Sequence, residues 1–193
     1  MDFVLKDSES IIEYAKKLNS ELIVVELIKS REVRDLKRQL DKANGLVVVE
    51  GGDDQINRTA LESKKVDILL SPEKDREKDF MKVRDSGLNQ VLCKLAKNNN
   101  IAIGFNFNDI LNANSLERSR ILGKMIQNVD LCKKYKVRTV VGSFASRWED
   151  LRSESDLESF ARVIGIEKVN NKNVISKLKN KKDYIIDGVK LLK

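Results

Sequence analysis

The residues best suited to chemistry in this chain are carboxylates and glycines that directly follow short apolar runs. Glu26 and Glu50 end two such runs, and Gly51-Gly52-Asp53 follows the second. Paired carboxylates can hold Mg²⁺, and a glycine-rich turn ahead of a helix can cradle a phosphate. The structural alternatives stay open. The glutamates can form a structural pair or neutralise arginines, and Gly51-Gly52 can be a tight turn with Asp53 as helix N-cap.

The chain contains no histidine. Histidine is the usual general base near neutral pH and a common metal ligand. Its absence excludes Ser-His-Asp and Cys-His nucleophilic sites and histidine-coordinated zinc. The sequence also contains no Walker A loop, no CxxC pair and no GxGxxG motif. We therefore predict no catalytic residue and no metal ligand, with a carboxylate-bound Mg²⁺ site or a lysine Schiff base as the alternative.

Arginines are predicted to gather where strands end and helices begin. Arg84 precedes one predicted helix, Arg118 and Arg120 lie in the first turns of another, and Arg147 and Arg152 follow a predicted strand. A cation near a helix N-terminus opposes the helix dipole by ~0.3–1 kcal/mol, and a bound phosphate would reverse that penalty. Arg118 therefore indicates a phosphate-binding rim, and the alternative is an internal pair with an aspartate or glutamate.

The charge balance favours a polyanionic partner. The net charge is +7, from 37 basic and 30 acidic residues, and residues 168–193 carry eight lysines against two aspartates, a net of +6. Such a cluster either binds nucleic-acid phosphates or forms a solvated helix face. Lys177 and Lys181 belong to it. Trp148 could stack on a base, although a single tryptophan is more often a core residue.

Short β-branched runs alternate with helical patterns along the chain. Strands are predicted at residues 3–5, 22–26, 46–50, 66–70, 101–105 and 139–142. Because these runs are nearly continuously apolar, they suit strands that are buried on both faces of a parallel sheet. Helices are predicted between them. The longest runs from an N-cap at Asn114 to about Tyr135, and the last third of the chain is predicted to be helical, at 156–164 and 174–180.

This alternation predicts one α/β domain over residues 1–193, with a basic helical part from about residue 168. We favour a compact, TIM-like (β/α) barrel that need not be regular, and an open doubly wound sheet is the alternative. In a barrel, strand C-termini and helix N-termini share one rim. That rim would bring the arginines and carboxylates together.

The expected location is the cytoplasm. No stretch approaches the ~20 apolar residues of a membrane span, and the segment MDFVLKDSES lacks the apolar core of a signal peptide. Cys93 and Cys132 lie among apolar neighbours on predicted helices. We interpret them as buried thiols of a reducing compartment, with a disulfide as the alternative.

One long stretch resembles a known family. The segments RDSGLNQVLCKLAKNNNIAIGFNFNDIL (84–111), RSRILGKMIQNVDLCKKYKVRTVVGSFAS (118–146) and, more weakly, DLRSESDLESFARVIG (150–165) are similar to ribonuclease P protein component 3. The first 80 residues match mainly in architecture. Two positions depart from the family pattern, since Asn108 stands where a basic residue is usual and Gln90 where histidine is common.

The resemblance implies a barrel related to histidinol-phosphatase-type metal phosphoesterases that has lost their metal ligands. It also implies assembly with ribonuclease P RNA and ribonuclease P protein component 2, contact with precursor tRNA through that complex, and Mg²⁺ held by the RNA, with no cofactor on the protein. Arg84, Arg118, Arg120 and Arg152 fit the family's basic positions.

We therefore predict a non-catalytic, RNA-binding subunit of ribonuclease P that supports RNA-catalysed removal of the 5′ leader from precursor tRNA. The predicted RNA-binding residues are Arg84, Arg118, Arg120, Arg147, Arg152, Lys94, Lys177 and Lys181. Two other classes of function stay open. One is a barrel enzyme acting on a small phosphorylated substrate through Mg²⁺ or lysine chemistry, and the other is a scaffold whose basic surface recruits an acidic protein.

Overall fold

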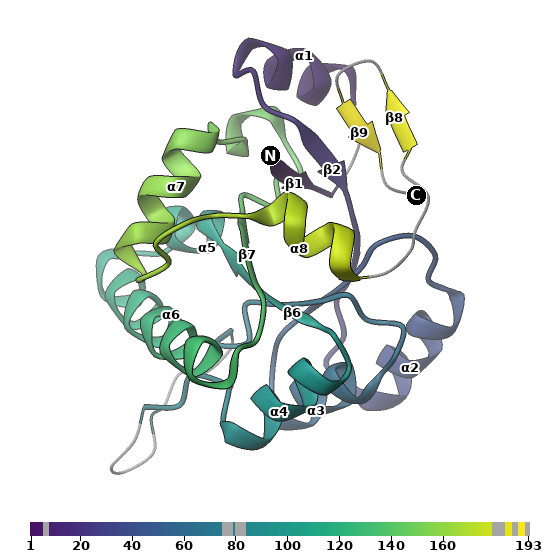
Figure 1. Cartoon of the computed structure of the whole chain (residues 1–193), viewed down its shortest axis with the longest axis vertical. Coiled ribbons are helices and arrows are strands. Elements are labelled where there is room, and N and C mark those ends of the chain that lie inside the picture. The colour runs from purple at the N-terminus through teal and green to yellow at the C-terminus, as the bar shows by residue number, and fades with distance from the viewer. Residues whose placement is uncertain (6–7, 75–78, 80–83, 179–183, 187–188, 192–193) are drawn as a thin grey trace.

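The computed structural model describes residues 1–5, 8–74, 79, 84–178, 184–186 and 189–191 (Figure 1). In chain order its elements are β1 (Asp2–Val4), α1 (Glu9–Lys17), β2 (Leu22–Val24), β3 (Glu26–Ile28), α2 (Val33–Lys42), β4 (Val47–Glu50), α3 (Asp54–Glu62), β5 (Ile68–Leu70), α4 (Gln90–Asn98), β6 (Ala102–Asn106), α5 (Phe107–Asn112), α6 (Ser115–Tyr135), β7 (Thr139–Gly142), the short 3₁₀ helix η1 (Trp148–Asp150), α7 (Glu154–Val163), α8 (Asn171–Leu178), β8 (Tyr184–Ile186) and β9 (Val189–Leu191).

The parallel strands close into a ring. Strands β3 to β7 form one sheet in chain order, and β1 pairs with β2. Strands β2 and β3 are two halves of one extended run, separated by Val25, whose N–H donates to Val4 O at 2.9 Å. On its other side, β1 reaches the segment just beyond β7, where Leu5 N donates to Ala145 O at 2.8 Å. This ring confirms the predicted TIM-like barrel. The alternative, an open doubly wound sheet, is wrong.

Both faces of the barrel strands are buried. Val48 and Ile68 belong to the apolar cluster inside the ring, whereas Val49 and Leu69 pack against the surrounding helices. Figure 1 shows those helices, α2, α3, α4, α6 and α7, around the strands. The continuous apolar runs of the sequence thus reflect strands with an inner and an outer apolar face, as in other parallel sheets.

The start of α8 belongs to the barrel wall. The Asn171 side chain accepts from Val141 N at 3.2 Å and donates to Val141 O at 2.7 Å. It therefore replaces the backbone of a neighbouring strand at this edge of β7. Val174 and Ile175 pack against the inner apolar cluster, and Figure 1 shows α8 lying over β7. The basic helical part predicted from about residue 168 therefore begins as an architectural helix, but β8 and β9 pair as antiparallel strands, so the prediction of helix is wrong for those residues.

Local signals set the helix ends. Asn114 caps α6 by accepting from Glu117 N at 3.0 Å, as predicted. Lys136, at φ 56°, ends the same helix in the left-handed region. Cys93 on α4 and Cys132 on α6 are free, buried thiols, which confirms their interpretation as small buried groups. Among the described residues, every helix is too short or too polar to cross a membrane.

Candidate functional site

Charged side chains at the C-terminal ends of β3 to β6 form one chain of ion pairs. Lys29 Nζ and Lys74 Nζ both contact Glu50 Oε1, at 3.1 and 2.7 Å, and Lys74 Nζ lies 3.9 Å from Asp109 Oδ1. Ser71 Oγ donates to Asp109 Oδ2 at 2.6 Å. Burial raises the pKa of Asp109, and Lys74 opposes that rise. The rim carboxylates are thus compensated by lysines and by hydrogen-bond donors from neighbouring loops.

The interpretation of Glu26 and Glu50 as a metal-binding pair is wrong. Glu26 begins β3 and lies opposite Val47, whereas Glu50 ends β4, so the two carboxylates lie at opposite ends of adjacent strands. Glu26 is exposed and accepts from Asn44 N at 3.0 Å. Within the described part of the chain, no group of three or more acidic or cysteine side chains could hold a metal ion.

The turn at Gly51-Gly52-Asp53 is a structural turn. Asp53 caps α3 by accepting from Ile56 N at 2.8 Å. A Cβ at Gly51 would lie 2.6 Å from Ser71 O, so only glycine allows this close approach of two loops. The N–H of Gly52 already donates to Asn57 Oδ1 at 3.0 Å. A phosphate cradle would need this backbone N–H, but it already donates to a side chain of the protein.

A buried acid lies next to this rim. Glu73 is 4% exposed, and its Oε2 accepts from Asn128 Nδ2 at 3.0 Å. Glu73 Oε1 and Asn128 Oδ1 have no hydrogen-bond partner among the described residues. Burial raises the pKa of Glu73 to about 8. A proton on Oε1 makes it a donor where the unpartnered Asn128 oxygen is an acceptor, so a neutral Glu73 suits this environment.

Arg118 is bound within the fold. Its Nε donates to Ile110 O at 2.9 Å and its Nη2 to Ala113 O at 3.0 Å. Because the C-terminal carbonyls of a helix attract cations, this guanidinium stabilises the end of α5. The cost of a cation at the start of α6 is therefore offset within the fold, and the predicted contact of Arg118 with an RNA phosphate stays a prediction. Its partners are backbone carbonyls, and the carboxylate partner of the alternative interpretation is not among them.

We expect Arg118→Ala to lower the free energy of unfolding by about 1–2 kcal/mol, because it leaves the carbonyls at the end of α5 without their charged donor. Urea unfolding of the free protein measures this. Arg120→Ala is the matched control, since Arg120 is exposed on the same helix, as Arg118 is, but has no hydrogen bond to the end of α5 among the described residues, and its effect should stay within about 0.5 kcal/mol. Equal unfolding midpoints for the two variants would contradict the assignment.

The loop after β7 also uses its arginines locally. Arg147 donates from Nε and Nη2 to the two carboxylate oxygens of Asp150, both at 3.0 Å. Arg152 Nη1 donates to Glu149 O at 2.8 Å and to Leu151 O at 2.6 Å. These bonds fix the shape of η1 and its flanks, so both arginines have structural roles in addition to any contact with RNA.

Trp148, in the same loop, differs from expectation, and Asn108, in α5, contacts that loop. Trp148 is 43% exposed and packs edge-on against Tyr14, with ring centroids 5.1 Å apart, so its interpretation as a core residue is wrong. Asn108 stands where the family resemblance implies a basic residue. It is buried, and its Nδ2 donates to Ser143 O at 2.8 Å, so this position holds the loop after β7 in place.

The remaining predicted RNA-binding residues do not form one cluster. Arg84, Arg120 and Lys94 are exposed. A Cβ at Gly123, one turn after Arg120, would lie 2.5 Å from Arg84 Nη1, so the Arg84 guanidinium lies on the surface of α6. Arg84 and Arg120 are therefore neighbours, whereas Lys94 lies on α4. Lys181 lies outside the described residues, and Lys177, in α8, lies outside the described side chains.

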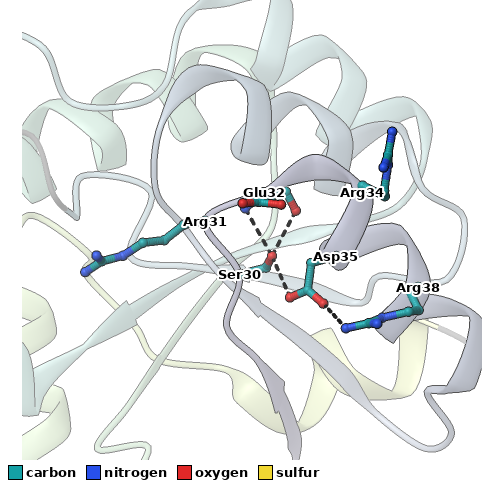
Figure 2. Close-up of a pocket in the computed structure, with 6 residues that line it drawn as sticks. All are labelled: Ser30, Arg31, Glu32, Arg34, Asp35 and Arg38. Carbon is teal, nitrogen blue, oxygen red and sulfur yellow. Dashed lines mark hydrogen bonds and ion pairs between the residues drawn. The ribbon is translucent and has the colours of Figure 1, made fainter.

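A basic surface that the sequence analysis missed lies on the loop between β3 and α2. Figure 2 shows the hollow there, lined by Ser30, Arg31, Glu32, Arg34, Asp35 and Arg38. Its signal is present in the sequence, because residues 29–42 contain six basic and three acidic side chains, a net of +3. Interspersed acids made this cluster less evident than the lysine-rich C-terminal segment.

Comparisons with known proteins agree on one family. The model of the family described as RNase P subunit p30 matches residues 21–181. A ribonuclease P protein component 3 from Methanococcus maripaludis is 32% identical over 158 residues, which are 80% of this chain and 65% of that protein. Its counterpart from Methanosarcina acetivorans is 36% identical over 155 residues, which are 76% of this chain and 62% of that protein.

The chain is also similar to a chain of one solved structure. One chain of the cryo-EM structure of archaeal ribonuclease P with mature tRNA has a TM-score of 0.68 and 28% sequence identity to this chain. The similarity covers 91% of this chain and 78% of that chain. The present chain spans just under two thirds of the length of the curated relatives that it matches, 65% and 62% for the two proteins above.

Proposed function

The chain belongs to the RNase P subunit p30 family, and on that premise we propose that it is an RNA-binding protein subunit of ribonuclease P. In that role it supports removal of the 5′ leader from precursor tRNA. The observation that carries the proposal is the likeness, over 91% of this chain, to a chain of archaeal ribonuclease P solved with mature tRNA. The basic surfaces at α2 and at Arg84 and Arg120 supply cations suited to phosphate contacts.

We propose further that the protein does not catalyse the cleavage. It contains no histidine, and its rim carboxylates, Glu50 and Asp109, are bound by lysine and hydroxyl donors. The Mg²⁺ that activates the hydrolytic water would then be held by the RNA. An enzyme using lysine chemistry is not favoured, because Lys74, the lysine at the centre of the rim, lies against two carboxylates.

The proposed partners follow from the same premise. They are ribonuclease P RNA, precursor tRNA through the assembled complex, and ribonuclease P protein component 2. The proposed location is the cytoplasm, which the free thiols of Cys93 and Cys132 support. Co-expression with component 2 and size-exclusion chromatography tests that pairing.

Purification of the tagged chain from its native host is expected to bring down ribonuclease P RNA as the main RNA. Phosphate contacts alone give little selectivity, so recovery of one RNA requires assembly into a defined particle. RNA sequencing of the eluate measures this. An unrelated basic protein with the same tag is the control, and an RNA profile identical to that control would contradict the proposed function.

A further inference from the structure

The surface around the start of α2 combines several cations with a rigid support. Arg31, in the loop after β3, and Arg34 and Arg38, in α2, line the hollow of Figure 2, and all three side chains are exposed. We call these three residues the α2 arginine surface. Leu36 and Leu40, on the opposite side of α2, are buried in the core. Core packing therefore fixes the position of α2, and with it the backbone from which Arg34 and Arg38 extend.

The acids near this surface do not cancel its charge. Asp35 contacts Arg38 Nη2 at 2.7 Å and also accepts from Gln39 Nε2 at 2.6 Å. These hydrogen bonds, the one from Gln39 first, hold the pKa of Asp35 below its ordinary value. Within the described part of the chain, Arg31 and Arg34 have no ion pair. Two of the three guanidinium groups thus lack a counter-charge.

Other acids of the segment are also occupied. Asp41, at the end of α2, pairs with Lys65 at 2.8 Å, and Glu50 pairs with Lys29 at 3.1 Å. Glu32 is the exception, because only its backbone oxygen and nitrogen bind Ser30 Oγ; with its carboxylate counted, three arginines face two acids in the hollow, a net charge of +1. The local excess of positive charge is therefore a property of the folded structure and is available to an external anion.

The geometry favours an extended polyanion over a single small anion. Figure 2 shows the guanidinium groups of Arg31, Arg34 and Arg38 well apart, with Arg31 across the hollow from the other two and Arg38 turned toward Asp35, so they do not converge on one point. Helix residues four apart have Cβ atoms roughly 5–6 Å from each other, so Arg34 and Arg38 can contact different phosphates of one strand. The planar guanidinium suits bidentate contact with phosphate oxygens.

We propose that the α2 arginine surface binds the sugar–phosphate backbone of RNA, independently of base sequence. This inference rests on the proposed function and adds a second contact region to it. Figure 1 shows α2 and α6 on opposite sides of the barrel, so the α2 arginine surface is separate from Arg84 and Arg120. An RNA bound both there and at the α2 arginine surface would contact the barrel on two sides.

The test compares variants of the full chain in binding to ribonuclease P RNA over a series of salt concentrations. The informative variant is Arg31→Ala/Arg34→Ala, because neither side chain forms an ion pair with any residue that the structure describes, so the substitutions break no described ion pair. We expect its affinity to fall about tenfold to fiftyfold near 0.1 M salt, and the slope of log affinity against log salt to flatten by roughly 1.4–1.8. Arg31→Lys/Arg34→Lys should retain most of the slope.

A matched control removes two cations elsewhere. Lys17→Ala/Arg162→Ala loses the same charge from exposed surface pairs on α1 and α7, and its slope should stay near that of the wild type. Circular dichroism melting shows that each variant is folded. A wild-type slope in the α2 variant would overturn this inference while leaving the proposed function intact. The inference would also be overturned if Arg31→Ala/Arg34→Ala lost binding to polyglutamate, which stands in for an acidic protein, but kept its binding to RNA. Failure of the wild type to bind RNA would instead refute the proposed function.

Discussion

Replacing Asn57 with alanine is expected to lower the free energy of unfolding by about 3–4 kcal/mol. Asn57 is fully buried, and its Nδ2 lies within hydrogen-bond distance of Gly52 O, Pro72 O and Gly87 O, at 3.3, 3.0 and 3.2 Å. Its Oδ1 accepts from Gly52 N at 3.0 Å. This single amide joins the turns after β4 and β5 to the approach to α4, and each buried group left unpaired costs about 1–3 kcal/mol.

The measurement is urea unfolding of Asn57→Ala beside Asn99→Ala. Asn99 is partly buried and its side chain donates to a single carbonyl, Leu61 O, at 2.7 Å, so its replacement should cost only about 1 kcal/mol. The difference between the two variants isolates the effect of joining several loops. Similar losses for both would show that Asn57 is not the link between the rim loops.

Stability is expected to fall as the pH rises from about 5 to 8, because Glu73 is buried as a neutral acid. Its pKa in the folded protein is about 8, above the ordinary value of 4.5. The proton on Glu73 stabilises the folded state fully when the pH is below the pKa of Glu73 in the unfolded chain. This stabilisation is lost as the pH rises through the pKa in the folded protein, and the free energy of unfolding changes by at most about 5 kcal/mol. The facing groups are Asp109, which raises this pKa, and Lys124 and Asn128, which lower it.

Glu73→Gln should flatten this pH dependence, because glutamine stays neutral at every pH and its amide oxygen can still accept from Asn128 Nδ2. At pH 8 the variant should be more stable than the wild type by a few kcal/mol, and at pH 5 the two should be similar. Urea midpoints across that range measure the effect. Glu13→Gln, on the exposed surface of α1, should keep the wild-type profile. An unchanged profile in Glu73→Gln would show that Glu73 is charged in the folded state.

The fold could be predicted because its signals are local and repeated. Runs such as the one ending at Glu50 are apolar at successive positions, since Val48 faces the inside of the ring and Val49 the helices. The caps at Asp53 and Asn114 were identified from residue type and position alone. The run from Leu22 was misread at its end, because the strand continues past the exposed Glu26 to Ile28 after changing partner at Val25.

The site could be predicted less well, because it depends on contacts between distant segments. The sequence shows Arg118 near the start of a helix, but it does not show that α5 ends against that position and offers its carbonyls. It shows three arginines and three acids around α2, but not that Asp35 and Asp41 are already paired. Burial of Glu73 also depends on a distant helix, since its partner Asn128 lies 55 residues away on α6.

The central claim is that this protein acts through ribonuclease P RNA, and reconstituted cleavage of precursor tRNA tests it most directly. The rate is measured over a range of Mg²⁺ concentrations with the RNA and the other protein subunits, with and without this chain, and with this chain alone. We expect the complete mixture to cleave faster, or at lower Mg²⁺, than the mixture without this chain, and the RNA-free protein to give no product. Identical rates and Mg²⁺ dependence with and without the chain, or turnover by the protein alone, would contradict the account.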